Sequence, residues 1–144
     1  MRFGFRLESI LKLRKLQEEE AQKELLKVRR EREAIEQKLR SLNEERLDAI
    51  KRRNESIENG EIDKIEAWRL YILGIENKIK KIEFELQIKL KEEEKALEKY
   101  LDRKKEKESL VKLKEKKKMG FLKEIDNQER KLIDEIAERK HWWK

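Results

Sequence analysis

The chain of 144 residues contains no cysteine, no proline and only four glycines. Without cysteine it can form neither a disulfide framework nor a thiolate metal site. Four glycines and no proline are too few for the many turns of a β-sandwich, a barrel or a βαβ fold. No run of about 18 apolar residues occurs, and the N-terminus lacks the apolar stretch of a secretory signal. The expected compartment is therefore the cytoplasm.

Charged residues dominate the composition. Lys and Arg total 40 against 33 Asp and Glu, which gives a net charge of +7, and 51% of all residues are charged while 36% are hydrophobic. A compact globular domain usually has an apolar content of about 45–50%. Disorder would be the alternative at such a composition, but the apolar residues recur with a helical period. This combination predicts long helices or a coiled coil.

The first half of the chain has the pattern of one long helix. Apolar residues recur at spacings of three and four from Leu7 to Ile57, and nothing between them breaks a helix. The residues that fit a heptad are Leu25, Val28, Ile35, Leu39, Leu42 and Ala49, with Arg32 and Arg46 in the same seam. So narrow a stripe predicts pairing with a single partner helix.

The pair Asn59-Gly60 is the only strong turn signal. It predicts a first helix over about residues 5–58, a turn at about 59–61 and a second helix over about 62–140, with Asp63 as a candidate N-cap. The apolar stripe of the second helix contains Ile65, Ile72, Ile75, Ile79, Ile82, Leu86, Leu90, Leu97 and Tyr100. Gly74 and Gly120 are the positions at which this helix could bend.

These elements predict an all-α fold, a single antiparallel coiled-coil hairpin over residues 1–144. A short link forces the helices to run antiparallel, and facing residue numbers should sum to about 120, which places Leu39 opposite Ile79 and Ile82. The second helix is the longer one, so everything beyond about Leu113 should form a C-terminal overhang without a partner in the chain. An unpaired apolar stripe predicts a contact surface for another molecule. The apolar residues of this overhang include Phe121, Leu122, Ile125, Leu132, Ile136, Trp142 and Trp143.

The sequence contains no arrangement typical of catalysis. A two-helix rod offers no dry pocket, and His141 is the only histidine. No glycine-rich phosphate loop occurs, and the carboxylates alternate with Lys and Arg at spacings typical of surface ion pairs. We therefore predict that the chain is not an enzyme and has no catalytic, cofactor-binding or metal-binding residues.

The positive charge is concentrated in residues 101–120, which contain nine basic and four acidic side chains. Such a segment could follow phosphates, contact an acidic protein or an anionic membrane surface, or simply be solvated. Acidic residues interrupt it, and it lacks the base-reading pattern of a basic zipper. Specific nucleic-acid binding is therefore not expected.

Aromatic residues gather at two places. Trp68 and Tyr71 share one side of the second helix just after the turn, and Ile75 continues that side. They either close the hairpin tip by local packing or form a docking patch. At the other end, Trp142 and Trp143 form either a frayed end or an anchor for a partner.

Both ends of the chain carry a resemblance. Residues 3–14, FGFRLESILKLR, resemble the opening of the flagellar export protein family FliJ, with its Phe-x-Phe, Arg-Leu and Leu-x-x-Arg pattern. Residues 131–137, KLIDEIA, resemble the Leu-Asp-Glu-Leu-Ala segment of that family, with Ile in place of both Leu residues. Chain length and the long hairpin agree with the family over essentially the whole chain.

This resemblance implies a part of the type III export apparatus at the cytoplasmic face of the inner membrane, similar to the γ-subunit stalk of rotary ATPases. The implied partners are the hexameric ring of the export ATPase, the cytoplasmic domain of the export gate and export chaperones. The residues expected to contact the ring are Phe121, Leu122, Ile125, Leu132 and Ile136. The residues expected to dock at the gate are Leu42, Trp68, Tyr71 and Ile75. The alternatives are a generic cytoplasmic coiled-coil scaffold and a basic-helix nucleic-acid-binding protein.

Overall fold

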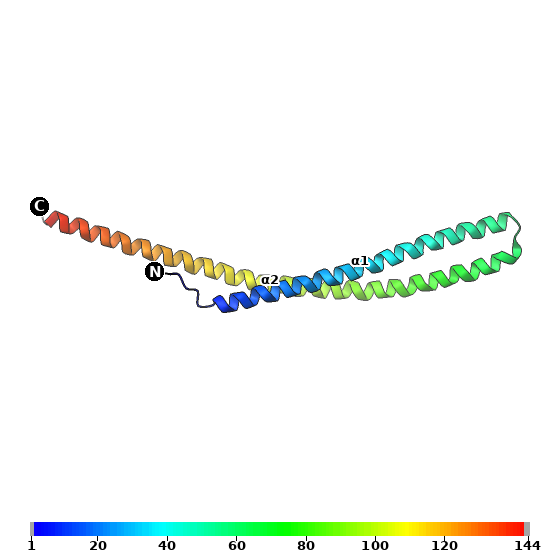
Figure 1. Ribbon diagram of the computed structural model, residues 1–144, viewed down its shortest axis with the longest axis horizontal. Helices are drawn as coiled ribbons and strands as arrows, with labels where there is room; N and C mark the ends of the chain where they lie inside the picture. Colours follow the sequence, from blue (N-terminus) through cyan, green and yellow to red (C-terminus); the bar gives the residue numbers. More distant parts are fainter. Residues whose placement is uncertain (1, 143–144) are drawn as a thin grey trace. The chain divides into compact units, whose positions relative to one another are not determined.

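The computed structural model describes residues 2–142, and within this range it contains two helices and no strand. Helix α1 is Glu8–Glu58 and helix α2 is Ile62–Trp142, with 51 and 81 residues respectively (Figure 1). The predicted all-α fold with a longer second helix is therefore confirmed. Trp143, named above as part of the aromatic end, lies outside the described residues, as do the side chains of His141 and Trp142.

Helix α1 begins at Glu8, a few residues later than the predicted start near residue 5. Residues 2–7, which precede it, are not helical, and the amide of Glu8 donates a hydrogen bond of 3.0 Å to the carbonyl oxygen of Phe5. The Glu8 carboxylate then lies in the first turn of the helix, where the helix dipole favours a negative charge.

Helix α1 ends in a Schellman motif centred on Gly60. The amide of Glu61 donates to the carbonyl of Ser56 at 2.9 Å, and the amide of Gly60 donates to that of Ile57 at 3.2 Å. Gly60 has a φ of 69°, a left-handed conformation that side-chain-bearing residues rarely adopt. The Asn59-Gly60 signal therefore marks the chain reversal.

The N-terminus of α2 differs from its predicted form. The helix begins at Ile62, so Asp63 is inside its first turn, and the prediction of an Asp63 N-cap is wrong. The amide of Lys64 donates to the carbonyl of Glu61 at 3.1 Å. Asp63 still stabilises this end, because its carboxylate lies near the positive end of the helix dipole.

Contacts between the two helices divide the chain into two units. One unit contains residues 21–100, that is, the turn with the adjoining parts of α1 and α2. The other contains the N-terminal residues up to Glu20 and the part of α2 from Leu101 onwards.

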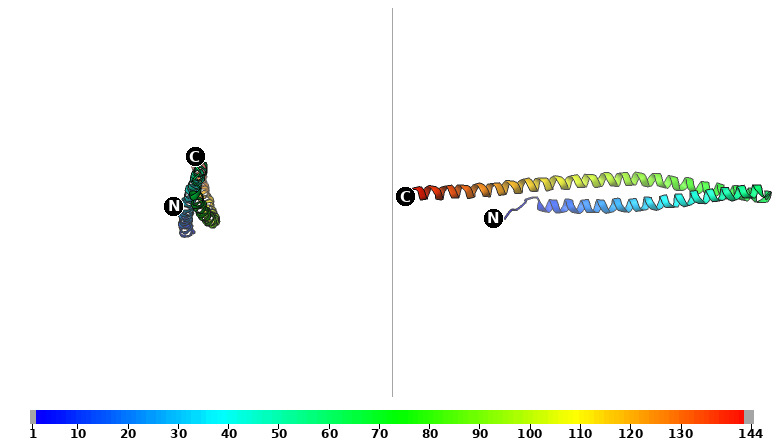
Figure 2. Two further views of the ribbon diagram at one scale, coloured as in Figure 1. Left: turned by 90° about the vertical axis from the view of Figure 1, so that its right-hand side faces the viewer. Right: turned by 90° about the horizontal axis from the view of Figure 1, so that it is seen from above.

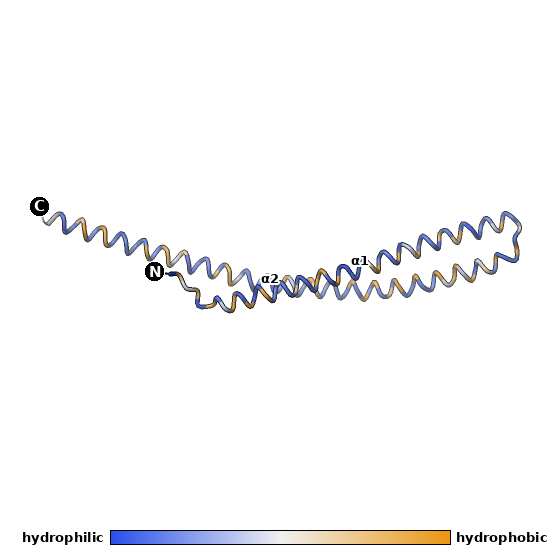
Figure 3. Tube along the Cα trace, in the orientation of Figure 1, coloured by the Kyte–Doolittle hydropathy of each residue, from blue (hydrophilic) through white to orange (hydrophobic). Residues whose placement is uncertain are grey.

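The core of the unit of residues 21–100 lies between antiparallel helices (Figures 1 and 2). Its buried members near the turn are Ala49, Ile72, Ile75 and Ile79, and the side chains packed against them are Leu39, Leu42, Ile50 and Trp68. Figure 3 shows how sparsely the apolar positions recur along predominantly hydrophilic helices. The core is therefore a narrow apolar seam between α1 and α2, in agreement with the heptad pattern.

Ion pairs across the seam fix the register of this unit. Arg46 lies 3.2 Å from Glu76, and Lys89 lies 2.6 Å from Glu31. Arg32 forms an ion pair with Glu93, which explains how an arginine is accommodated among the apolar seam positions. The residue numbers of these pairs sum to between 120 and 125, close to the predicted 120. These pairings stabilise the unit, because a charged group left alone beside the seam would be costly.

The unit formed by both chain ends has the same arrangement. Leu11 is its most buried side chain, with 1% of its surface exposed. The ion pairs between α1 and α2 here join Arg14 to Glu106 at 3.1 Å, Glu18 to Lys107 at 2.5 Å and Glu8 to Lys114 at 2.8 Å. Their residue numbers again sum to between 120 and 125.

The two glycines Gly60 and Gly74 should respond oppositely to alanine. Gly60→Ala should lower the free energy of unfolding by about 1–2 kcal/mol, because alanine is strained at a φ of 69°. Gly74→Ala should raise it by about 0.5–1 kcal/mol, because a Cβ atom at this helical position meets nothing within 4 Å. Urea unfolding followed by circular dichroism measures both. Equal effects of the two substitutions would contradict the left-handed turn at Gly60.

Candidate functional site

The first candidate surface lies near the turn and is formed mainly by Trp68 and Tyr71. Their rings meet edge to face with centroids 5.8 Å apart. Trp68 is half-buried against the core, whereas 47% of Tyr71 is exposed. Both line an open hollow of about 320 Å³, whose other lining residues are Glu45, Asp48, Ala49, Arg52 and Ala67. We call Trp68, Tyr71 and this hollow the tip surface.

Two other residues predicted for this surface lie elsewhere. Ile75 is 2% exposed and belongs to the core, so its assignment to an exposed docking surface is corrected. Leu42 is half-buried and packs against the same core. Tyr71 and Ile75 are four residues apart and therefore lie on the same side of α2, but this side of the helix is the one that faces the seam. Tyr71 lies at the edge of the seam, whereas α1 covers Ile75.

Carboxylates and a hydroxyl organise the tip surface. The Tyr71 hydroxyl donates a hydrogen bond of 2.5 Å to Oε1 of Glu45, and Arg52 lies 3.2 Å from Asp48. The hydrogen bond to Glu45, together with desolvation and the charge of that carboxylate, raises the pKa of Tyr71. The hydroxyl therefore stays protonated and holds the aromatic ring in one orientation across the two helices.

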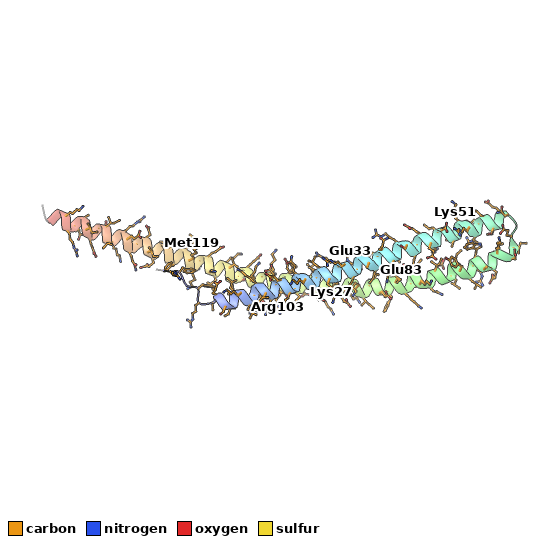
Figure 4. The ribbon with its side chains drawn as sticks, in the orientation of Figure 1. Lys27, Glu33, Lys51, Glu83, Arg103 and Met119 are labelled. Atoms are coloured by element: carbon orange, nitrogen blue, oxygen red, sulfur yellow. The ribbon has the colours of Figure 1, made fainter. Side chains whose placement is uncertain are left out.

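The second candidate surface is the part of α2 that follows Phe121. Its exposed apolar residues are Leu122, Leu132, Ile133 and Ile136, with exposed fractions from 46% to 64%. Ile125 is half-buried. Side chains project from all sides of this part of the helix, as Figure 4 shows beyond the labelled Met119. We call these five residues the C-terminal surface.

The predicted start of the unpaired region is corrected by the N-terminal segment. The ring of Phe3 lies 5.6 Å from that of Phe121, so Phe121 has a partner within the chain. Residues 3–7 together with Leu113, Lys117 and Phe121 line a hollow of about 670 Å³. The unpaired region therefore begins after Phe121 and not at about Leu113. The prediction considered only contacts between the two helices and gave no role to the non-helical residues 2–7.

One group of exposed residues was missed at the sequence level. Leu70, Leu73, Phe84 and Ile88 are 45–69% exposed. At 3.6 residues per turn they share the side of α2 that faces away from the seam. Their spacings of 3, 11 and 4 are themselves helical, so a search for a second apolar stripe on the same helix would have found them.

Among residues 2–142, no group of three or more His, Cys, Asp or Glu side chains is arranged to hold a metal ion. Neither helix, over the same range, has a stretch that is long and apolar enough to cross a membrane. The functional features of this structure are exposed side chains on a helical hairpin. The fold and these surfaces define an all-α helical hairpin of the coiled-coil class.

The chain belongs to the FliJ family, because the sequence model described as "Flagellar FliJ protein" matches residues 3–144. Members of this family are non-enzymatic components of the flagellar protein export apparatus. The resemblance seen at both ends of the sequence is thereby confirmed. Neither the curated proteins nor the solved structures include a match to this chain.

The hydrogen bond between Tyr71 and Glu45 can be tested by titration. In a Tyr100→Phe background Tyr71 is the only tyrosine, and we expect it to ionise above the usual pKa of about 10. Adding Glu45→Gln should lower that pKa, because the favourable charge–dipole contact is lost. The folded state favours the protonated hydroxyl, so the stability from this bond is present below about pH 10 and is lost as the pH rises further. Phenolate absorbance measures the shift, and an unchanged pKa would contradict the contact.

Proposed function

We propose that this protein is a stalk and adaptor of the flagellar export apparatus, with separate surfaces for the export ATPase ring and for the export gate. Family membership supports a place in the flagellar export apparatus. The exposed apolar residues of the C-terminal surface are the observation on which the proposed stalk role depends. A long helix with exposed apolar residues on a charged background is the kind of element that a ring of subunits can surround.

The C-terminal surface is the part that we assign to the ATPase ring. It follows the last aromatic contact with the N-terminal segment, and its apolar side chains are about half exposed. Burying the exposed half of each would contribute about 1 kcal/mol per side chain to binding. A stalk of this type would resemble the γ subunit of rotary ATPases, as the family resemblance implies.

The tip surface is the part that we assign to the cytoplasmic domain of the gate. Tyrosine and tryptophan are frequent binding hot spots, because they contribute a large contact area at a low cost in side-chain entropy. Tyr71 is exposed and held by Glu45, so it is already ordered before a partner arrives.

The proposal also includes export chaperones, on the strength of family membership alone. It places the protein at the cytoplasmic face of the inner membrane, where its partners would hold it. No membrane contact of its own is required for this location.

The C-terminal surface should be necessary for binding to the ATPase. The triple variant Leu122→Ala, Leu132→Ala and Ile136→Ala should weaken binding to the purified export ATPase by about 100-fold, because about 1 kcal/mol is lost at each position. The same variant should also reduce stimulation of ATP hydrolysis. Alanine favours helix, so the helical content should remain unchanged.

A matched control for this variant is Leu26→Ala with Leu47→Ala, which removes two exposed leucines of α1 in the other unit. The control should bind the ATPase like the unaltered protein. If the triple variant binds the ATPase as tightly as the control does, the C-terminal surface is not the ring contact.

The tip surface should be necessary for binding to the gate. Tyr71→Ala should weaken binding to the gate's cytoplasmic domain by about tenfold or more, the usual effect of truncating an aromatic hot spot, and should leave ATPase binding unchanged. Phe84→Ala is the matched control, because Phe84 is 69% exposed on the opposite side of the same helix. Calorimetric titrations of both variants measure the effect. A loss caused by Phe84→Ala but not by Tyr71→Ala would move the gate contact to that opposite side.

A further inference from the structure

The whole net charge of the chain lies in 21 residues of α2. Residues 103–123 contain ten basic and three acidic side chains, a surplus of seven that equals the net charge of the entire chain. The remaining 123 residues contain thirty of each sign and are neutral overall. This segment lies within the unit formed by both chain ends.

Part of this surplus is aligned. At 3.6 residues per turn, Lys105, Lys112, Lys116 and Lys123 fall within about 40° of one another around α2. All four side chains are exposed. They extend along roughly 27 Å of helix, at successive spacings of 7, 4 and 7 residues. We call these four residues the lysine row.

The lysine row faces away from α1. Lys107 and Lys114, which form ion pairs with Glu18 and Glu8 of α1, lie on the opposite side of α2, roughly 180–200° around the helix. The cations on the inner side are therefore engaged in holding the hairpin together. Within the described part of the chain, no lysine of the row forms an ion pair, and Glu108 and Glu115 flank the row without pairing with it.

We propose that the lysine row is a docking surface for an acidic helix of a partner protein. Lys112 and Lys116 are like charges four residues apart, an arrangement that destabilises an isolated helix. An acidic partner converts that repulsion into attraction. This surface is separate from the apolar residues of the C-terminal surface, so it does not depend on the role assigned to them.

The spacing identifies a helix as the partner element. A partner helix that runs alongside α2 has the same rise and the same number of residues per turn. Carboxylates at spacings of 7, 4 and 7 on one of its sides therefore meet the row at each position. An anionic membrane is less well matched, because the face of the row contains Met119 but no continuous apolar stripe for insertion into lipid. Nucleic acid is also less well matched, because the row contains no arginine for bidentate contacts with phosphates or guanines.

A pair of designed peptides tests this proposal on the full-length protein. Both are alanine-rich helical peptides with four glutamates. One carries the glutamates at spacings of 7, 4 and 7 on one side, and the other distributes them around the helix. Fluorescence anisotropy at low salt should show about tenfold tighter binding of the aligned peptide, since four exposed ion pairs of modest strength act together. Binding should weaken as salt is added.

Charge reversal locates the contact. The variant with Lys105→Glu, Lys112→Glu, Lys116→Glu and Lys123→Glu should lose binding to the aligned peptide and gain binding to its lysine counterpart. The matched control reverses four exposed lysines of the other unit, Lys38, Lys51, Lys78 and Lys91. It changes the net charge by the same amount and should retain most of the binding. Circular dichroism should show equal helical content in both variants.

Three results would overturn the proposal. The first is equal binding of the aligned and the scattered peptide, which would mean that only net charge matters. The second is an equal loss of binding in the row variant and in the control variant. The third is tighter binding of duplex DNA or of phosphatidylserine vesicles than of the aligned peptide at matched charge concentration and salt, which would assign the row to nucleic acid or to a membrane.

Discussion

The narrow seam between α1 and α2 is the constraint on which the rest of the structure depends. A seam of single apolar residues buries little surface, so it cannot by itself exclude a shift of one helix along the other. Ion pairs between the helices, such as Arg46 with Glu76 and Arg14 with Glu106, favour one register in each unit. A shift of register would separate the members of these pairs.

The seam also decides which side chains remain for binding. Ile75 and Tyr71 are four residues apart, yet one is buried in the core and the other is exposed beside Glu45. On the opposite side of α2, Leu70, Leu73, Phe84 and Ile88 are left without cover. A protein with so small a core keeps most of its apolar residues accessible, and this accessibility is consistent with a protein that works by contact.

The charged residues of α2 also differ between the side that faces α1 and the side that faces outward. Cations that face α1, such as Lys107 and Lys114, are paired and stabilise the hairpin. Cations that face outward, such as Lys112 and Lys116, form no ion pair among the described residues, and these two lysines repel each other. The long helix therefore separates structural charges on one side from charges on the other side that are free for a partner.

The sequence by itself determined the helices, the reversal at Gly60 and the register. These depend on local rules, namely an apolar period, a helix stop signal and a short link that forces antiparallel pairing. Only the tertiary structure decided that Ile75 is covered and that Phe3 covers Phe121. Burial depends on what packs from the other chain segment, and a non-helical segment such as residues 2–7 has no periodic pattern to reveal its partner. The sequence could therefore indicate which parts of the chain have surfaces available for function. Which residues belong to each surface could be decided only from the fold.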